Sequence, residues 1–151
     1  MLLQTKYFGA IECPEENRLH FSGGLFGFED EKEFFLLPFE GSGGSLLCFQ
    51  SAVTPALAFV AVNPFSFKPD YAPVLTGAEL KALGVERSED LCFYALCVVR
   101  DPVGESTVNL RCPIAVNDHT RQAVQVILES DAYHMHHPLS ELERGGEAQV
   151  C

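Results

Sequence analysis

The chain is poor in basic residues. Its 151 residues include 10 Lys and Arg against 21 Asp and Glu, which gives a formal net charge of −11. Proteins that bind nucleic acid irrespective of sequence use Lys and Arg to neutralise phosphates, and basic segments likewise hold proteins on anionic membranes. The composition therefore predicts no direct contact with nucleic acid and none with a membrane. A partner that complements this charge would itself be basic.

Long apolar runs are also missing. The longest, Leu91 to Val99, has nine residues, about half of the ~20 that a membrane-spanning helix needs. Residues 1–6 do not show the basic region and apolar stretch of a secretory signal. We therefore expect a cytoplasmic protein, and we expect its six cysteines to be buried free thiols, since disulfides are rare in that compartment.

Motifs that carry catalysis are absent as well. The sequence holds no Gly-x-x-x-x-Gly-Lys-Ser/Thr loop and no Gly-x-Ser-x-Gly nucleophile elbow, and the glycines at 23–27 lack the dinucleotide-binding spacing. Paired carboxylates without a pocket do not indicate a glycosidase. Missing motifs disfavour an enzyme only weakly and do not exclude one. Our expectation, to which the resemblance described below contributes, is a protein that is not an enzyme and that needs no cofactor.

A histidine cluster keeps one alternative open. His134, His136 and His137 could bind a metal, although neighbouring positions on a strand point to opposite faces and no cysteine pair frames them. The interpretation that we favour is ordinary surface histidines and no metal. The alternative is a small-molecule-binding or metal-dependent hydrolytic β-barrel that uses these three side chains.

Alternating apolar residues and closely spaced turns predict short strands along most of the chain. Apart from an N-terminal segment with Leu3, Tyr7 and Ile11 on one face, strands are expected at 18–21, 34–39, 46–49, 57–62, 91–99, 107–111, 114–116 and 124–128. The segment Leu91 to Val99 is apolar on both faces, which favours a central strand. A capping box at Thr76 to Glu79 begins one helix, which Gly84 ends. The predicted fold is all-β: a compact, mostly antiparallel β-barrel-like domain with one short helix.

Residues 63–73 form the most unusual stretch. Its three prolines exclude a regular helix or a central strand, and Phe65, Phe67 and Tyr71 are three aromatic residues within seven positions. A stiff aromatic loop loses little entropy on binding, which suits a recognition surface. The same loop could instead fold back as a lid with its aromatic rings in the core. Both interpretations are open at this point.

A second candidate segment is the acidic cluster at 29–33, Glu-Asp-Glu-Lys-Glu. It is either a solvated turn or a docking patch, which at physiological salt would act over only about 8 Å. The candidate partner-binding residues are Glu29, Asp30, Asn63, Phe65, Pro69, Asp70 and Tyr71. In this assignment the aromatic rings anchor the partner and Asp70 meets a basic group. We expect Tyr71→Ala to weaken partner binding without loss of thermal stability.

Short motifs in a fixed order resemble the flagellar assembly factor family FliW. They lie at 5–9 (TKYFG), 21–29 (FSGGLFGFE), 57–65 (LAFVAVNPF), 69–71 (PDY), 107–114 (TVNLRCPI) and 137–139 (HPL). The sequence departs from the family at Phe26, where proline is usual. The resemblance implies one β-barrel-like domain over residues 1–139 without catalysis. Residues 140–151 have no clear counterpart, and we interpret them as a frayed acidic tail.

The resemblance also implies two protein partners. One is flagellin, bound at its C-terminal helical region, for which an amphipathic helix in an apolar groove is the expected mode. The other is CsrA, a basic translational repressor that binds flagellin messenger RNA. The two would bind in alternation, so that free protein restrains CsrA and relieves repression when flagellin is scarce. A flagellin chaperone that never binds CsrA is a further hypothesis.

Overall fold

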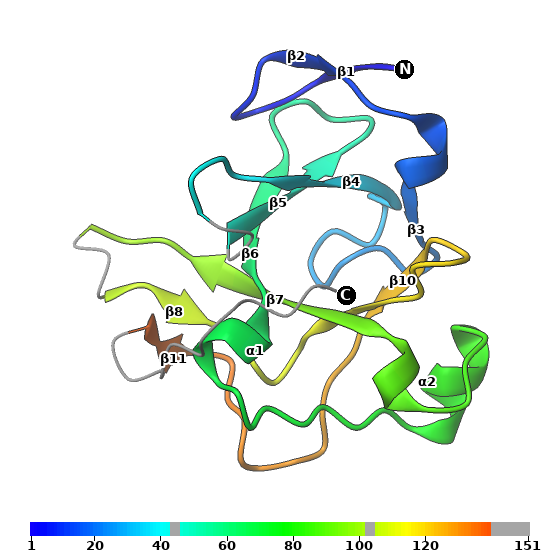
Figure 1. Cartoon of the computed structure of the whole chain (residues 1–151), viewed down its shortest axis with the longest axis vertical. Coiled ribbons are helices and arrows are strands. Elements are labelled where there is room, and N and C mark those ends of the chain that lie inside the picture. Colours follow the sequence, from blue (N-terminus) through cyan, green and yellow to red (C-terminus); the bar gives the residue numbers. More distant parts are fainter. Residues whose placement is uncertain (43–45, 102–104, 140–151) are drawn as a thin grey trace.

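Short strands pair into a nine-stranded sheet and a separate two-stranded hairpin in the computed structural model, which describes residues 1–42, 46–101 and 105–139 (Figure 1). The strands are β1 (Leu2–Gln4), β2 (Ala10–Glu12), β3 (Leu19–Phe21), β4 (Glu33–Pro38), β5 (Leu46–Ser51), β6 (Ala58–Val62), β7 (Cys92–Val98), β8 (Thr107–Val108), β9 (Ile114–Val116), β10 (Gln122–Gln125) and β11 (His137–Pro138). The helices are α1 (Pro64–Phe67) and α2 (Gly77–Ala82), with single 3-10 turns η1 (Glu15–Asn17) and η2 (Ser88–Asp90).

Seven of the strands close a barrel in the order β7-β6-β5-β4-β3-β10-β9, because β9 pairs with β7 as well as with β10. Every neighbouring pair in this ring is antiparallel except β3 and β10, which are parallel. Strands β8 and β11 extend the sheet beyond β7. The predicted all-β, mostly antiparallel barrel is therefore confirmed.

Strand β7 separates two hydrophobic clusters. Cys92 and Tyr94 belong to the first cluster, in which Phe21 packs edge-on against Phe34 at a ring-centroid distance of 5.3 Å. Phe93 and Ala95, whose side chains point to the other face of β7, belong to the second cluster. This cluster lies beneath α1 and α2. Successive side chains of a strand point to opposite faces, so a strand between two cores is apolar throughout. This confirms the prediction of a central strand.

The helices differ in part from the prediction. Helix α2 begins with the expected capping box between Thr76 and Glu79. Helix α1, however, lies inside the proline-rich stretch, where a helix was not expected. The Asn63 side chain accepts a hydrogen bond from the Phe65 N–H at 3.0 Å, and Pro64 occupies the first helical position. A proline there loses no hydrogen bond, because that N–H has no partner inside the helix.

Three predicted strands differ most from the observed bounds: the N-terminal segment, the segment 107–111, of which only Thr107–Val108 is β8, and the segment 124–128. The N-terminal segment is a hairpin in which Leu3 of β1 lies opposite Ile11 of β2. The last predicted strand, 124–128, is replaced by β10, which ends at Gln125. The ladder breaks there because the Val126 and Leu128 N–H groups donate to the carbonyls of residues 113 and 111 instead of to β9. The interpretation of residues 140–151 as a frayed tail lies outside the described residues.

The cysteines largely follow the expectation. Cys13, Cys48, Cys97 and Cys112 are free thiols, and all of them except Cys97 are buried. Cys92 is disulfide-bonded, which corrects the expectation of free thiols at that position. In the described part of the chain, no helix has the length and apolar character that crossing a membrane requires.

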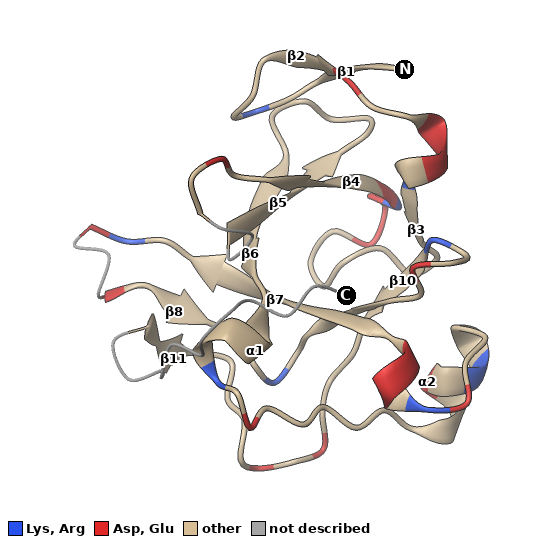
Figure 2. Cartoon of the chain, in the orientation of Figure 1, with Lys and Arg blue, Asp and Glu red and all other residues tan. Residues whose placement is uncertain are grey.

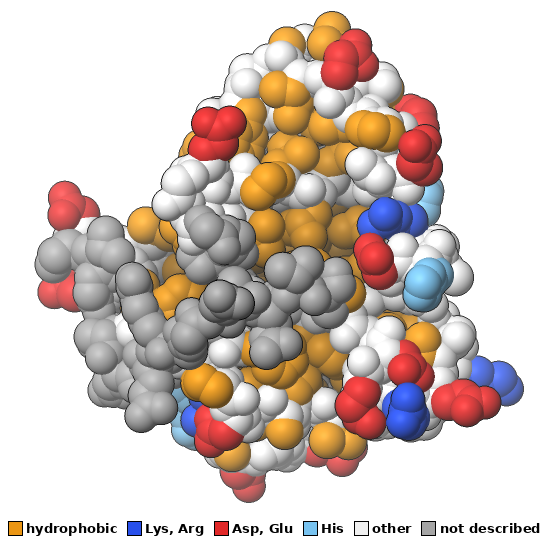
Figure 3. Space-filling view, in the orientation of Figure 1, with side chains coloured by type: hydrophobic (Ala, Val, Ile, Leu, Met, Phe, Trp, Pro, Cys, Tyr) orange, Lys and Arg blue, Asp and Glu red, His pale blue; other side chains and the backbone are white. Residues whose placement is uncertain are grey.

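Charged side chains lie mostly on loops and short helices around the barrel, as Figure 2 shows. Figure 3 shows the same face in space-filling form, with hydrophobic side chains across its middle and acidic side chains along its margins. On this face, the described acidic side chains therefore lie around an apolar centre.

Candidate functional site: an aromatic groove with an acidic rim

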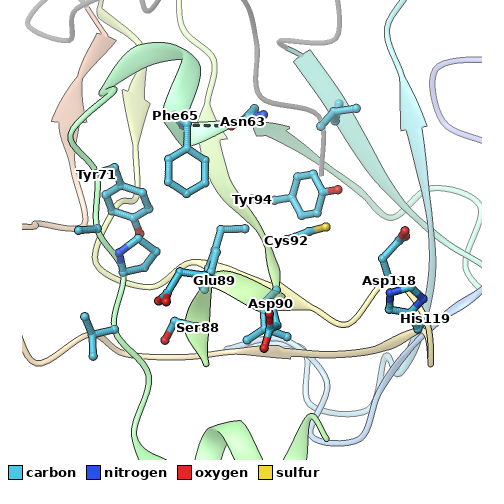
Figure 4. A pocket seen from close by; sticks show the side chains of 16 residues that line it. Asn63, Phe65, Tyr71, Ser88, Glu89, Asp90, Cys92, Tyr94, Asp118 and His119 are labelled. Atoms are coloured by element: carbon cyan, nitrogen blue, oxygen red, sulfur yellow. Dashed lines mark hydrogen bonds between the residues drawn. The ribbon is translucent and has the colours of Figure 1, made fainter. Parts of the chain in front are cut away.

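A groove of about 810 Å³ opens beside the start of β7 (Figure 4). Its walls come from α1, from the segment after it at 71–74, from η2, and from the turn between β9 and β10. We call it the β7 groove. It draws side chains from both hydrophobic clusters, because Phe65 packs against the second cluster and Tyr94 against the first.

Aromatic rings form one side of the β7 groove. Phe65 is half-buried, and its ring centroid lies 5.7 Å from that of Tyr71. Tyr94 packs edge-on against Phe49 at 5.7 Å and presents its hydroxyl to the groove. The hydroxyl of Tyr94 makes no hydrogen bond within the part of the chain that the structure describes.

Carboxylates form the opposite side. Glu89, Asp90 and Asp118 line the groove and are exposed, and no Lys or Arg lines it among the described residues. Asp90 forms an ion pair with Arg87 at 3.5 Å, and Asp118 forms one with Arg121 at 2.9 Å. The rim therefore carries negative charge next to an apolar wall.

One of these carboxylates, that of Asp118, also affects the pKa of the Tyr94 hydroxyl. Burial raises the pKa of the Tyr94 hydroxyl above its ordinary value, the nearby Asp118 carboxylate raises the pKa further, and Arg121 lowers it. The hydroxyl therefore stays protonated at neutral pH. In chemical terms the groove offers apolar surface, a tyrosine hydroxyl that can donate a hydrogen bond, and a cation-attracting rim.

Three of the sequence-predicted residues line this groove: Asn63, Phe65 and Tyr71. Asn63 is buried and caps α1, so its role here is to hold the turn that presents Phe65. Phe65 faces the groove as the binding-surface interpretation expects. The assignment of these residues to partner binding stays a prediction.

Tyr71 is a core residue as well as part of the groove wall. Only 4% of it is exposed, its hydroxyl donates to the Leu110 carbonyl at 2.7 Å, and its ring packs edge-on against Tyr133 at 4.7 Å. Phe67 is also buried. The lid interpretation therefore applies to these two rings. The expectation that Tyr71→Ala leaves stability unchanged conflicts with this burial.

The other predicted residues do not line the groove. Pro69 and Asp70 are exposed, and the Asp70 carboxylate pairs with Lys68 at 3.2 Å. Glu29 and Asp30 are exposed in the loop after β3, where Glu29 accepts a hydrogen bond from the Gly27 N–H at 2.8 Å.

That loop turns back tightly on itself. Gly24 has φ +66°, and a Cβ at this position would lie 2.5 Å from the Glu29 carbonyl oxygen, so only glycine fits there. The turn leaves Phe26 with 49% of its surface exposed, beside a smaller pocket of about 370 Å³.

Sequence reasoning missed Glu89, Asp90, Tyr94 and Asp118 as groove residues. They come from three segments that meet only through the closure of the barrel between β9 and β7. One local signal was available, because a tyrosine inside a strand that is apolar on both faces places a hydroxyl next to buried surface. Nothing local indicated Asp118.

The histidine cluster does not converge on a site. The His134 N–H donates to His137 Nε2 at 2.8 Å, and the two rings stack at 5.2 Å. Within residues 1–42, 46–101 and 105–139, no three His, Cys, Asp or Glu side chains form a group that could hold a metal ion. The hydrolytic alternative receives no support from this arrangement.

Comparison with known proteins adds independent evidence. A family model described as "FliW protein" matches residues 2–139. Flagellar assembly factors FliW from Shouchella clausii (strain KSM-K16) and Geobacillus thermodenitrificans (strain NG80-2) are 36% and 40% identical to this chain, covering 97% and 92% of it and 99% and 95% of their own lengths. A crystal structure of the flagellar assembly factor FliW matches with a TM-score of 0.85 and 38% identity, covering 92% of this chain and 96% of that one. These similarities confirm the resemblance seen in the sequence motifs.

Proposed function

Since the chain belongs to the FliW family of flagellar assembly factors, we propose that it acts in the cytoplasm by binding the C-terminal region of flagellin and, in alternation, the translational repressor CsrA. Binding of CsrA relieves repression of flagellin translation. The protein is a regulatory binding module in this proposal, and its groove holds a partner rather than transforming a substrate.

The β7 groove is the observation that carries the flagellin part of the proposal. An amphipathic helix buries its apolar face in a hydrophobic groove and keeps its polar face at the rim. Phe65 and Tyr94 supply the apolar wall, and Glu89 and Asp118 supply a polar rim. Aromatic residues at the centre of such a surface contribute most of the binding free energy.

Net charge supports the CsrA part. A molecule with a formal charge of −11 that binds a basic repressor adds negative potential beside the RNA-binding surface. Phosphate then loses part of the attraction that the Lys and Arg side chains of the repressor provide. This effect requires no overlap between the surface that binds this protein and the residues that contact bases.

The test uses the purified full chain and a fluorescently labelled peptide from the flagellin C-terminal region. We expect Phe65→Ala to weaken peptide binding about tenfold, as truncation of a central aromatic anchor does. Val53→Ala is the matched control, because Val53 is 72% exposed and does not line the groove. Circular dichroism during heating shows whether both variants keep their fold.

Capture from native lysate separates the remaining hypotheses. Recovery of both flagellin and CsrA, with flagellin displacing CsrA, supports the proposal. Recovery of flagellin alone assigns the chain to the chaperone hypothesis. A wild-type chain that binds neither flagellin nor CsrA refutes the proposed function.

A further inference from the structure

One carboxylate at the β7 groove differs from its neighbours. Asp90 forms an ion pair with Arg87, and Asp118 forms one with Arg121; neither arginine lines the groove. Glu89 is exposed and forms no ion pair with any residue that the structure describes. Its charge is therefore the one at this rim that a partner can neutralise without competing against an internal arginine.

We propose that the β7 groove selects an apolar peptide segment that carries a Lys or Arg, and that Glu89 and Tyr94 are the residues that determine this specificity. The inference deepens the proposed function, because it states the chemistry that a partner must present to this site. In this arrangement Glu89 pairs with the basic side chain, and the Tyr94 hydroxyl donates to a carbonyl of the bound peptide.

The placement of the side chains fits such a segment. Phe65 and Tyr94 stand on one side of the groove, and Glu89 and Asp90 stand on the other (Figure 4). A peptide whose apolar side chains contact the two rings presents its opposite side to the carboxylates. Tyr94 also lines the groove, and its hydroxyl can donate to a backbone carbonyl, which needs a donor when it is buried.

The charge of the rim also excludes other occupants. Nucleotides, phosphates and acidic peptides meet only carboxylates among the described charged residues of the groove. A second copy of this chain brings a net charge of −11 towards the same rim. A basic, apolar partner is the occupant that this field favours.

Two designed helical peptides test the inference independently of flagellin. Both have the same leucine positions, but one carries Lys and the other Glu at its polar positions. We expect the Lys peptide to bind the full chain and to shift the NMR signals of Phe65 and Tyr94. The Glu peptide should bind at least about tenfold more weakly, because its charges face those of the rim.

Variants then assign the effect to residues. Glu89→Gln should weaken binding of the Lys peptide about threefold at low salt and reduce its dependence on salt. Glu86→Gln is the matched control, because Glu86 is an exposed acid three residues away that does not line the groove; it should leave the affinity unchanged. Tyr94→Phe should weaken binding of both the Lys peptide and the flagellin peptide without changing the salt dependence.

The outcomes distinguish this inference from the proposed function. Equal binding of the two peptides, equal effects of Glu89→Gln and Glu86→Gln, or NMR shifts away from the groove would overturn the inference. So would a dimer that buries Tyr94, or a Tyr94 signal that moves when residues 140–151 are removed. If the Lys peptide binds as expected and flagellin does not bind at all, the inference stands and the flagellin proposal fails.

Discussion

At the scale of single residues, Tyr71 joins parts of the chain that are far apart in sequence. Its hydroxyl donates to the Leu110 carbonyl, and its ring contacts Tyr133, whose own hydroxyl accepts a hydrogen bond from the Ala72 N–H at 2.8 Å. The two tyrosines thus fix the segment after α1 against the connection between β8 and β9 and the connection between β10 and β11. One wall of the β7 groove depends on this pair.

Replacing Tyr71 should therefore cost stability. We expect Tyr71→Phe to lower the free energy of unfolding by about 1–2 kcal/mol, because the Leu110 carbonyl loses its buried donor. Tyr71→Ala should lower it by about 3–5 kcal/mol, since a large buried ring is lost. Urea unfolding measures both, with Tyr7→Phe as the control at an exposed tyrosine. If Tyr71→Ala left the free energy of unfolding unchanged, Tyr71 would contribute to partner binding and not to stability.

Cys48 gives a prediction on pH. It is fully buried, and burial raises the pKa of its thiol from 9.0 to about 11, although the nearby charge of Lys6 lowers it. Between these values the unfolded chain releases the thiol proton and the folded chain retains it. Stability due to this group is therefore complete below about pH 9 and falls as the pH rises through the folded pKa.

The measurement compares wild type with Cys48→Ala. The wild type should lose roughly 2 kcal/mol through this thiol between about pH 7.5 and about pH 10.5. The variant lacks the group, so the difference in unfolding free energy between the two proteins should shrink over that range. A difference that stays constant would mean that the thiol ionises equally in both states.

At the scale of elements, the β1–β2 hairpin packs on the barrel through Leu3 and Phe35, and one buried amide adds hydrogen bonds to this contact. The Oε1 atom of Gln50 accepts a hydrogen bond from the Lys6 N–H at 2.9 Å, and its Nε2 atom donates to the carbonyl oxygens of residues 51, 55 and 57. Gln50 has no exposed surface. A polar side chain buried to this degree is stable only while its bonds are made.

We expect Gln50→Leu to lower the free energy of unfolding by about 1–3 kcal/mol, because it leaves polar backbone groups without partners. Hydrogen exchange at the Lys6 amide should become faster than in wild type, since the hairpin can then open alone. Gln4→Leu is the control, because Gln4 lies in the same hairpin and is exposed. Unchanged exchange at Lys6 would show that the hairpin is held by other contacts.

Elements that depend on local pattern could be predicted from the sequence. The capping box set the start of α2, and the doubly apolar run set β7, because both signals lie within a few residues. Helix α1 could not be predicted, since the same prolines that break helices also begin them, and only the bond from the Phe65 N–H to Asn63 distinguishes the cases. Burial of Tyr71 depends on Leu110 and Tyr133, which no local pattern connects to it.

At the scale of the whole molecule, barrel closure decides which residues meet. Pairing of β7 with both β6 and β9 brings η2 close to the β9–β10 turn, so that Glu89 and Asp118 share one groove. Glu89 and Asp118 are far apart in sequence, so no local pattern indicates that they line the same groove. The composition shows that acidic residues outnumber basic ones. The structure adds where the individual charged side chains lie. Prediction from sequence therefore reached the fold and part of the groove wall, but not its rim.

The molecular charge leads to a prediction on salt. Antagonism of RNA binding by CsrA should weaken as salt rises, because the range of unscreened charge shrinks from roughly 30 Å at about 0.01 M to about 8 Å at about 0.15 M. The measurement is the affinity of CsrA for RNA, with and without this protein, across a salt series. RNA binding by CsrA alone provides the reference at each salt concentration, since it too depends on salt.

Charge placement refines that experiment. Glu29→Gln with Asp30→Asn removes two negative charges at the sequence-predicted docking patch, and Glu16→Gln with Glu86→Gln removes two exposed ones elsewhere. If the patch lies beside bound CsrA, the first pair should reduce antagonism several times more than the second at about 0.15 M salt, because screening confines the effect to about 8 Å. Equal effects would assign the antagonism to net charge. Antagonism that persists unchanged at high salt would exclude an electrostatic mechanism and require a change in the shape of CsrA.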